Sequence, residues 1–239
     1  MEDQIQIKTN DDHLIEGVLN SKQKSNKLII FVHGLTGHKN EHHFFNAVKY
    51  FTSKGFDTFR FDLYSYIDKG RKLRDCSIKT HSKDLEVVIK RFENTYEELY
   101  LVGHSIGGPT VLWADHKRVN SVVLWDPSYK ILDDIKDELV FVENLNLYLV
   151  NWGVEYLLSK EMVEDFKLLD ERLLDYFSKP TKIICAEKGV LDKVWKKNIE
   201  SINVKNDFVI VKNAGHCFDE EGTEQVLFEE TLKWFDSNF

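Results

Sequence analysis

Residues 99–107, Leu-Tyr-Leu-Val-Gly-His-Ser-Ile-Gly, decide the fold of this chain. The apolar run at 99–102 is typical of a buried strand, and a Gly-x-Ser-x-Gly pentapeptide follows it directly. Glycines on both sides of Ser105 allow a sharp turn, because larger side chains two residues away would clash. The pattern therefore predicts a strand, a tight turn that exposes the Ser105 hydroxyl, and a helix that starts near Gly107. The simpler alternative is a glycine-rich turn in which Ser105 only caps the helix.

On both sides of this unit, short β-branched runs alternate with longer amphipathic stretches. The predicted strands are residues 5–7, 14–18, 28–32, 56–61, 99–102, 119–125, 182–186 and 208–211, and the predicted helices are centred on 44–51, 85–92, the stretch after 107, 190–202 and 228–235. Such alternation is typical of a parallel sheet with helices on its faces. We expect an α/β fold with a mostly parallel eight-stranded sheet, covered by helices on both faces.

One segment, residues 127–179, interrupts the alternation and divides the predicted core into residues 1–126 and 180–239. Up to residue 178 it holds 12 Asp and Glu against five Lys and Arg. An insertion at the carboxyl edge of a parallel sheet lies where ligands bind, so we expect a lid. The alternative is a decorative insertion that only buries its own apolar face.

Inside this insertion, the apolar stretches 145–150 and 154–158 flank Asn-Trp-Gly, which predicts a hairpin, and residues 161–177 have a helical pattern. Aromatic and aliphatic side chains are expected to line a pocket under the lid. The candidates are Leu145, Leu147, Leu149, Trp152 and Tyr156.

Composition limits the classes of partner. The chain has 239 residues, of which 42% are hydrophobic, and its net charge is −8. An acidic surface repels phosphate backbones and anionic headgroups, so we expect neither nucleic acid nor membrane as a partner. We read no signal peptide at the N-terminus and no apolar run of about 20 residues. Three widely spaced cysteines favour reduced thiols and a cytoplasmic location.

A serine needs a base to take its proton, and His216 is the candidate. It follows the last predicted strand in Asn-Ala-Gly-His, which gives the chain order serine before histidine. The histidines other than His216 and His33 are interpreted as solvated, and His42 and His43 make a poor metal pair because adjacent residues face different ways. With no metal-ligand spacing in the sequence, we expect no metal and no organic cofactor.

The loop 33–37, His-Gly-Leu-Thr-Gly, follows the strand predicted at 28–32. A glycine-containing loop at that point can bring a backbone N–H beside Ser105. We expect the N–H groups of Leu35 and Ile106 to form an oxyanion hole, with His33 holding the loop by hydrogen bonds.

These three motifs, His-Gly-Leu-Thr-Gly, Gly-His-Ser-Ile-Gly-Gly and the Gly-His at 215–216, resemble the α/β-hydrolase superfamily. The nearest resemblance is to short-lid esterases of the feruloyl or cinnamoyl esterase and acylglycerol lipase types, and it covers nearly the whole chain outside 127–179. It implies a serine hydrolase. One departure is Phe-Asp-Leu-Tyr-Ser-Tyr-Ile at 61–67, where many relatives have Gly-His-Gly-x-Ser.

The second departure concerns the acid of the triad. Relatives of this kind usually place it just after the strand at 182–186, but here that slot holds Gly189. Asp126, in Trp-Asp-Pro after the strand at 119–125, resembles the acid of pancreatic-type lipases. Asp192, one helical turn after Gly189, is the alternative. We favour Asp126, because a carboxylate at the end of either strand can reach the same histidine.

Together, these residues predict hydrolysis of a small-molecule carboxylic ester with an apolar or aryl group, through Ser105, His216 and Asp126. The same residues also suit a thioesterase, an amidase or peptidase, or a hydrolase of carbon–carbon bonds. Because the acid is displaced, a catalytically silent ligand receptor is a further alternative. The oligomeric state is not indicated by the sequence.

Overall fold

The computed structural model describes residues 1–21 and 25–237. Its main sheet has eight strands in the order β1-β2-β4-β3-β5-β6-β10-β11. Only β2 pairs antiparallel, with β1 and β4, and all other neighbours are parallel. The strands are β1 Glu2–Lys8, β2 Leu14–Asn20, β3 Lys27–Val32, β4 Asp57–Phe61, β5 Glu98–His104, β6 Ser121–Trp125, β10 Thr181–Ala186 and β11 Asn206–Val211. The predicted mostly parallel eight-stranded sheet is confirmed.

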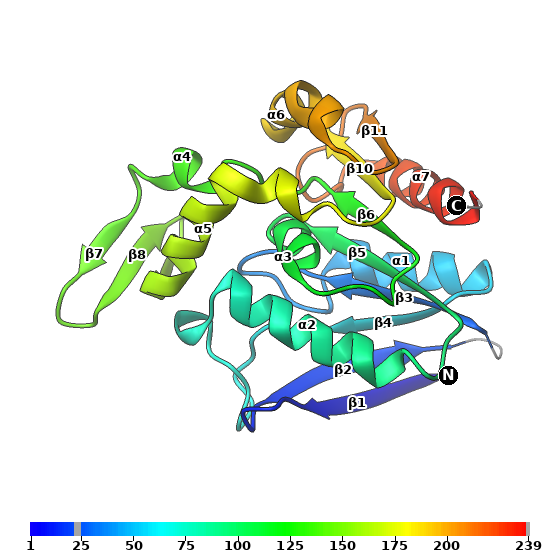
Figure 1. Cartoon of the computed structure of the whole chain (residues 1–239), viewed down its shortest axis with the longest axis horizontal. Coiled ribbons are helices and arrows are strands. Elements are labelled where there is room, and N and C mark those ends of the chain that lie inside the picture. The colour runs from blue at the N-terminus through cyan, green and yellow to red at the C-terminus, as the bar shows by residue number, and fades with distance from the viewer. Residues whose placement is uncertain (22–24, 238–239) are drawn as a thin grey trace.

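Helices cover both faces of this sheet, with α2 in front of it and α1 behind it in Figure 1. The helices are α1 His42–Ser53, α2 Ile78–Phe92, α3 Gly107–Trp113, α4 Ile131–Ile135, α5 Lys160–Arg172, α6 Leu191–Asn198 and α7 Thr223–Asp236. Short 3-10 helices follow α5 at Leu173–Tyr176 and α6 at Ile199–Ser201.

The central strands are apolar on both faces, because alternate side chains enter two different layers of the core. Leu28, Ile30 and Val32 pack in the layer that contains α2, whereas Ile29 and Phe31 pack in the layer that contains α1 and α7. This explains why the sequence of β3 is continuously apolar rather than alternating.

The segment after β6 forms α4, a small antiparallel sheet and α5, which extend away from the main sheet in Figure 1. The small sheet consists of β7 Val140–Val142, β8 Leu147–Asn151 and β9 Glu155–Leu158. The predicted hairpin is therefore present as β8 and β9, with Gly153 at a φ of 82° in its turn. The predicted helix 161–177 is shorter than expected, and β7 and α4 were not foreseen.

This segment is anchored on α2. The Lys79 N–H donates to the Asp165 carboxylate at 2.9 Å, and the Ser159 hydroxyl donates to the Cys76 carbonyl at 2.6 Å. The buried side chain of Phe166 belongs to the same apolar layer as α2. The segment is therefore packed as a continuation of the core.

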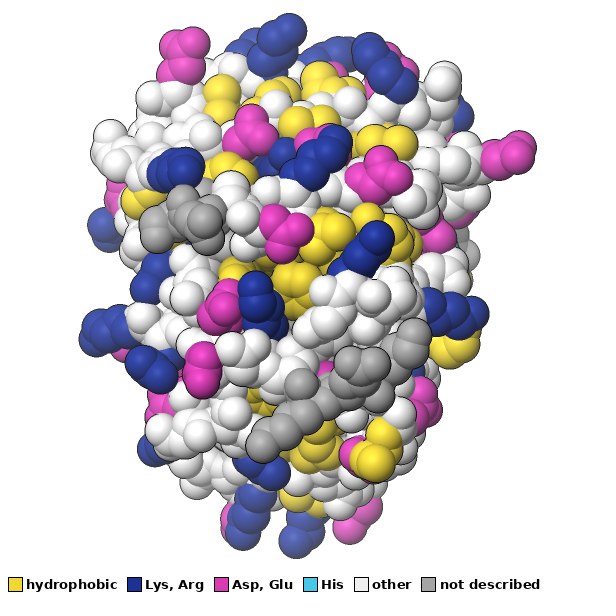
Figure 2. Space-filling model, turned by 90° about the vertical axis from the view of Figure 1, so that its right-hand side faces the viewer, with side chains coloured by type: hydrophobic (Ala, Val, Ile, Leu, Met, Phe, Trp, Pro, Cys, Tyr) yellow, Lys and Arg dark blue, Asp and Glu magenta, His cyan; other side chains and the backbone are white. Residues whose placement is uncertain are grey.

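The face of the molecule away from this segment carries Lys and Arg side chains interspersed with Asp and Glu, and hydrophobic side chains lie between them (Figure 2). No single-sign stripe of charge dominates this view. Across the described residues, none of the helices combines the length and the apolar character that crossing a bilayer requires.

Candidate active site

Ser105 lies between β5 and α3 in a strained conformation, with a φ of 53°. A Cβ atom on Gly103 would lie 2.4 Å from the Gly107 carbonyl oxygen, and one on Gly107 would lie 2.2 Å from that of Val32. Backbone atoms cannot move aside cheaply, so both glycines are required by the turn. The sharp turn expected from the Gly-x-Ser-x-Gly sequence is present.

His216 lies in the loop between β11 and α7, and its Nδ1 is 2.5 Å from Oδ2 of Asp126. The Asp126 side chain is 1% exposed, whereas that of His216 is 43% exposed. The Asp126 Oδ1 accepts a hydrogen bond from the Ala186 N–H at 3.0 Å. A buried carboxylate therefore orients an accessible imidazole, and a ring with Nδ1 bonded to the carboxylate has Nε2 available for a substrate or a nucleophile.

Asp192, the alternative acid, lies in the first turn of α6. Its Oδ1 is buried, and it has no hydrogen-bond partner among the residues that the structure describes. A Cβ atom on Gly189 would lie 3.4 Å from the Asp126 Oδ2. Position 189, where relatives usually carry the acid, therefore lies beside the Asp126 carboxylate. With glycine at position 189, Asp126 is the acid at this place.

A cavity of about 320 Å³ opens at the ends of these strands, and Ser105 and His216 both line it. Leu35 and Ile106, the residues expected to supply the oxyanion hole, line it as well. The remaining lining residues are Thr36, Ser128, Tyr129, Ile131, Ile135, Trp152, Val190 and Leu191. The nucleophile and base predicted from the sequence thus face one largely apolar cavity.

The wall of this cavity differs from the expected one. Of the five residues expected from the insertion, Trp152 lines the cavity, whereas Leu145 is half exposed at the turn between β7 and β8. The wall expected from the hairpin is formed instead by Tyr129 and by Ile131 and Ile135 of α4. The difference arises because α4 directly follows β6 and so reaches the sheet edge before the hairpin does.

Ser128 is a residue that the sequence did not reveal. Its Oγ lies 3.3 Å from the Oγ of Ser105, and its N–H donates to the Ser105 carbonyl at 3.1 Å. It is placed there by the turn after Asp126, whose φ of 39° is itself unusual. No sequence signal marks it beyond its position two residues after a candidate acid.

Strained residues cluster around the cavity. Thr36, Ser105, Asp126, Asn213 and Phe218 all have φ between 39° and 65°, and all lie in loops that carry or flank the candidate residues. Such conformations cost about 1–3 kcal/mol each and persist where the surroundings impose them.

His33 holds the loop that contains Leu35, as expected. Its Nδ1 donates to the Gly34 carbonyl at 2.7 Å, and its Nε2 accepts from the Leu63 N–H at 2.9 Å. Because an N–H points at Nε2, the ring must be neutral. Burial lowers the pKa of His33 to about 4, which agrees with this geometry.

The interpretation of most other histidines as solvated is wrong. Of the seven histidines other than His216 and His33, four are buried, namely His43, His81, His104 and His116. His43 and His104 lie near Glu41, and the possible ligand atoms of this group are all within 4.8 Å of one another. A single sequence does not show these contacts, because the histidines come from different elements.

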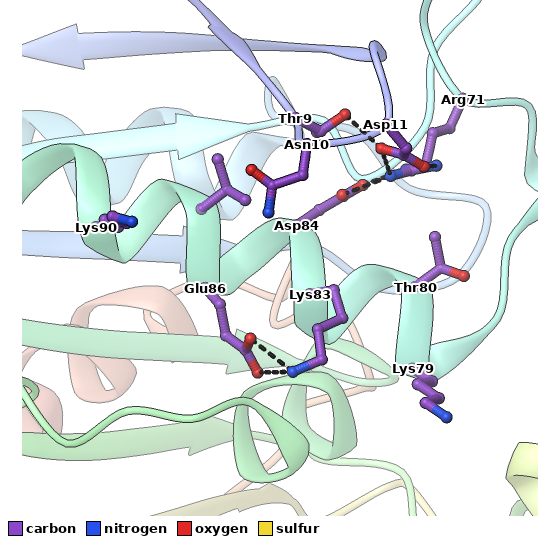
Figure 3. Close-up of a pocket in the computed structure, with 11 residues that line it drawn as sticks. Thr9, Asn10, Asp11, Arg71, Lys79, Thr80, Lys83, Asp84, Glu86 and Lys90 are labelled. Atoms are coloured by element: carbon purple, nitrogen blue, oxygen red, sulfur yellow. Dashed lines mark hydrogen bonds and ion pairs between the residues drawn. The ribbon is translucent and has the colours of Figure 1, made fainter.

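A second hollow, of about 620 Å³, lies between α2 and the turn that joins β1 to β2 (Figure 3). Most of its charges are paired within the protein: Arg71 contacts Asp11 and Asp84, and Lys83 contacts Glu86. Paired charges of this kind favour a role in anchoring the turn to the helix rather than in binding a ligand.

Three solved structures illustrate the similarity of the whole chain to known proteins. Est1E from Butyrivibrio proteoclasticus, with bound ferulic acid, is 18% identical, with 97% of both chains covered and a TM-score of 0.78. A dienelactone hydrolase from Anabaena variabilis is 16% identical, with 98% of this chain and 96% of that chain covered and a TM-score of 0.73. DcsB, in complex with a substrate analogue, is 16% identical, with both chains fully covered and a TM-score of 0.81. At these identities, the likeness shows a shared fold.

No curated protein matches the chain by sequence. A family model described as the alpha/beta hydrolase fold matches residues 27–175, which is more than half of the 239 residues. The match includes the turn at Ser105 and the insertion as far as α5, and the expected resemblance is confirmed. The chain therefore belongs to the α/β-hydrolase family.

Proposed function

We propose that the chain is a serine hydrolase that cleaves carboxylic esters carrying an apolar or aryl group. The observation that carries this proposal is the 2.5 Å contact between His216 and the buried Asp126, at a cavity that Ser105 also lines. A nucleophile, a base and a carboxylate that orients the base are the parts that acyl transfer to serine requires.

In the proposed reaction, the Nε2 of His216 takes the proton of Ser105 while Oγ attacks the acyl carbon. The N–H groups of Leu35 and Ile106 stabilise the oxyanion, and His216 then protonates the leaving alcohol. In the second half, His216 removes a proton from water, which attacks the acyl-enzyme and releases the acid. Asp126 stays ionised throughout and stabilises the imidazolium.

The cavity supports an apolar or aryl substrate, because its wall is built from Tyr129, Ile131, Ile135 and Trp152. The ferulic acid bound by Est1E, a protein with the same fold, is consistent with an aryl acyl group. The acidic charge of residues 127–179 disfavours coenzyme A thioesters, because their phosphates would be repelled. We propose that this segment acts as the lid of the cavity.

Two measurements on the same samples test the proposal. A fluorophosphonate probe should label the folded protein, and a series of p-nitrophenyl esters of graded acyl length should be hydrolysed. Two serine hydroxyls lie 3.3 Å apart at the site, so the variants have to separate them. Ser105→Ala should abolish both labelling and turnover, whereas Ser128→Ala should still be labelled. A folded wild-type protein that neither labels nor hydrolyses any ester would sink the proposal and support a ligand receptor.

A further inference from the structure

We propose that Glu41, His43 and His104 form a buried binding site for a divalent transition-metal ion, with Zn²⁺ as the ion that best fits the ligands. The site lies outside the substrate cavity, and none of its three residues lines that cavity. It joins the start of α1 to the end of β5, immediately before Ser105.

The three side chains converge. Their ligand atoms all lie within 4.8 Å of one another, the His43 Nε2 is 3.9 Å from the Glu41 Oε2, and the rings of His43 and His104 have centroids 4.6 Å apart. The histidines are 1% and 3% exposed. The two imidazoles are therefore enclosed by the protein, and the partly buried Glu41 side chain reaches them from the start of α1.

Four polar atoms of this cluster lack hydrogen-bond partners among the described residues. Both ring nitrogens of His43, the Nδ1 of His104 and the Oε2 of Glu41 are buried without a hydrogen bond to any described residue. Leaving a buried polar group unpaired is destabilising, so native proteins rarely leave several side by side. A bound cation would engage one lone pair from each side chain at once.

The ring orientation of His104 matches that of a metal ligand. Its Nε2 lies 2.9 Å from the His216 carbonyl oxygen, and a carbonyl can only accept a hydrogen bond, so Nε2 carries the proton. The lone pair is then on Nδ1, which is buried and has no hydrogen bond to any described residue. A ligating histidine characteristically donates its other N–H to a carbonyl or carboxylate in this way.

Protons do not compete with a metal ion for the ring nitrogens of the two histidines. Burial lowers the pKa of His43 to about 3 and that of His104 well below its usual value, so both rings are neutral at physiological pH. Neutral imidazole is the form that binds a metal. Burial also raises the pKa of Glu41 to about 7, and an incoming cation would favour its ionised form.

The geometry needs only a small adjustment. Zn²⁺ requires nitrogen and oxygen ligands at about 2.0–2.2 Å, so each of the three side chains must close by less than about 1 Å. The absence of a side chain on Gly37 lets the Glu41 carboxylate lie where it does, because a Cβ atom there would be 2.6 Å from its Oε2. The positive end of α1 opposes a cation only weakly compared with direct coordination by three ligands.

The set of ligands favours Zn²⁺ over Mg²⁺ or Ca²⁺. Two imidazoles and one carboxylate suit zinc and its neighbours, whereas the alkaline-earth ions prefer oxygen ligands throughout. Three protein ligands also leave a fourth tetrahedral position open for water. We therefore expect one ion per chain, with Co²⁺ able to replace Zn²⁺ as a spectroscopic probe.

The test is a Zn²⁺ titration of the full chain after treatment with a chelator, by calorimetry, together with the visible absorption of the Co²⁺ form. The wild-type protein should bind one ion, give a tetrahedral Co²⁺ spectrum and unfold at a higher temperature with Zn²⁺ present. His43→Gln and Glu41→Gln should each weaken binding by at least about 10-fold. His42→Gln is the matched control, because His42 is the neighbouring residue but contacts Glu224 at the surface, and it should bind as the wild type does.

Each result decides the proposal. Zn²⁺ binding by the wild type that His43→Gln and Glu41→Gln do not weaken would place the ion at the surface and overturn it. So would the absence of binding to a folded wild-type protein, in which case water satisfies the cluster. If either variant fails to fold, as judged by circular dichroism, the other carries the test. All readouts report the metal, so they are independent of whether the chain hydrolyses esters, and the Ser105→Ala protein should bind Zn²⁺ equally.

Discussion

The carboxylate of Asp126 accepts hydrogen bonds from two sides, from the Ala186 N–H and from the His216 ring. Burying a carboxylate without hydrogen-bond partners is costly, so both contacts matter for holding it at this position. Oδ1 is held by the backbone of β10, and this leaves Oδ2 as the atom that meets the imidazole. Changing the carboxylate to an amide would preserve its shape while removing its charge and one acceptor.

We expect Asp126→Asn to lower kcat for p-nitrophenyl esters by about 10⁴-fold, because an amide that donates to Nδ1 holds the imidazole in the wrong tautomer. Asp192→Asn is the matched control and should stay within a few-fold of the wild type. Steady-state kinetics of both purified variants, with circular dichroism as a check of folding, provide the measurement. A large loss in Asp192→Asn together with an active Asp126→Asn would reverse the assignment.

At the residue scale, the sequence allowed prediction of those positions that have a local backbone signature. The turn at Ser105 is encoded by flanking glycines. Asp126 comes directly after β6, and His216 lies in the loop that follows β11, so both lie at the carboxyl ends of strands. Ser128, by contrast, reaches the site through an unusual φ at Asp126. The approach of His43 to His104 depends on how α1 packs against β5, which no local pattern encodes.

At the element scale, α4 is held in place as part of the cavity wall. The N–H groups of Ile131 and Leu132 donate to the Asp170 carboxylate at 2.6 and 2.8 Å. A carboxylate at these two N–H groups satisfies donors that a short helix leaves unpaired at its start. Because Asp170 belongs to α5, the two helices keep a fixed relation, and the position of Ile135 in the wall follows from it.

This wall should set which substrates fit. Ile135→Ala removes apolar volume from the cavity, so we expect the preferred acyl chain to lengthen, with kcat/KM for the longer ester rising about tenfold relative to the shorter one. Leu145→Ala is the control, because Leu145 belongs to the same insertion but is half exposed and does not line the cavity. The measurement is the ratio of kcat/KM values across a series of p-nitrophenyl esters. An unchanged ratio in Ile135→Ala would mean that the acyl group binds elsewhere.

The hydrophobic periodicity of the sequence predicted the helices and strands of the core, but it predicted those of the insertion only in part. Continuous apolar runs such as that of β3 have no other stable place than a sheet covered on both faces. In the insertion, β7 has only three residues and α4 only five, which is too few for a period to show. For this reason the sequence assigned the cavity wall to the hairpin. The strands of the hairpin are long enough for an apolar pattern to show, whereas α4 is not.

At the scale of the whole molecule, several buried histidines make stability depend on pH. Burial lowers the pKa of His33 to about 4 and that of His81 to about 3, while an unfolded chain binds protons near the ordinary value of 6.5. Between these values the unfolded state binds more protons than the folded state. The stabilising contribution is therefore complete above about pH 6.5 and is lost as pH falls toward 4 and below, by up to about 1.4 kcal/mol per pH unit for each histidine.

His33 allows this linkage to be tested at one position. Its Nε2 accepts from the Leu63 N–H and its Nδ1 donates to the Gly34 carbonyl, and a glutamine can both accept and donate without titrating. As the pH falls from 6.5 to 4, the free energy of unfolding should decrease less steeply in His33→Gln than in the wild type. The two slopes should differ by about 1.4 kcal/mol per pH unit. Urea unfolding at half-unit steps of pH, with a chelator present, gives the slopes. The control is His13→Gln, at a part-exposed position, which should keep the wild-type slope. Equal slopes in all three proteins would show that the neutral ring of His33 does not contribute to the acid sensitivity of the fold.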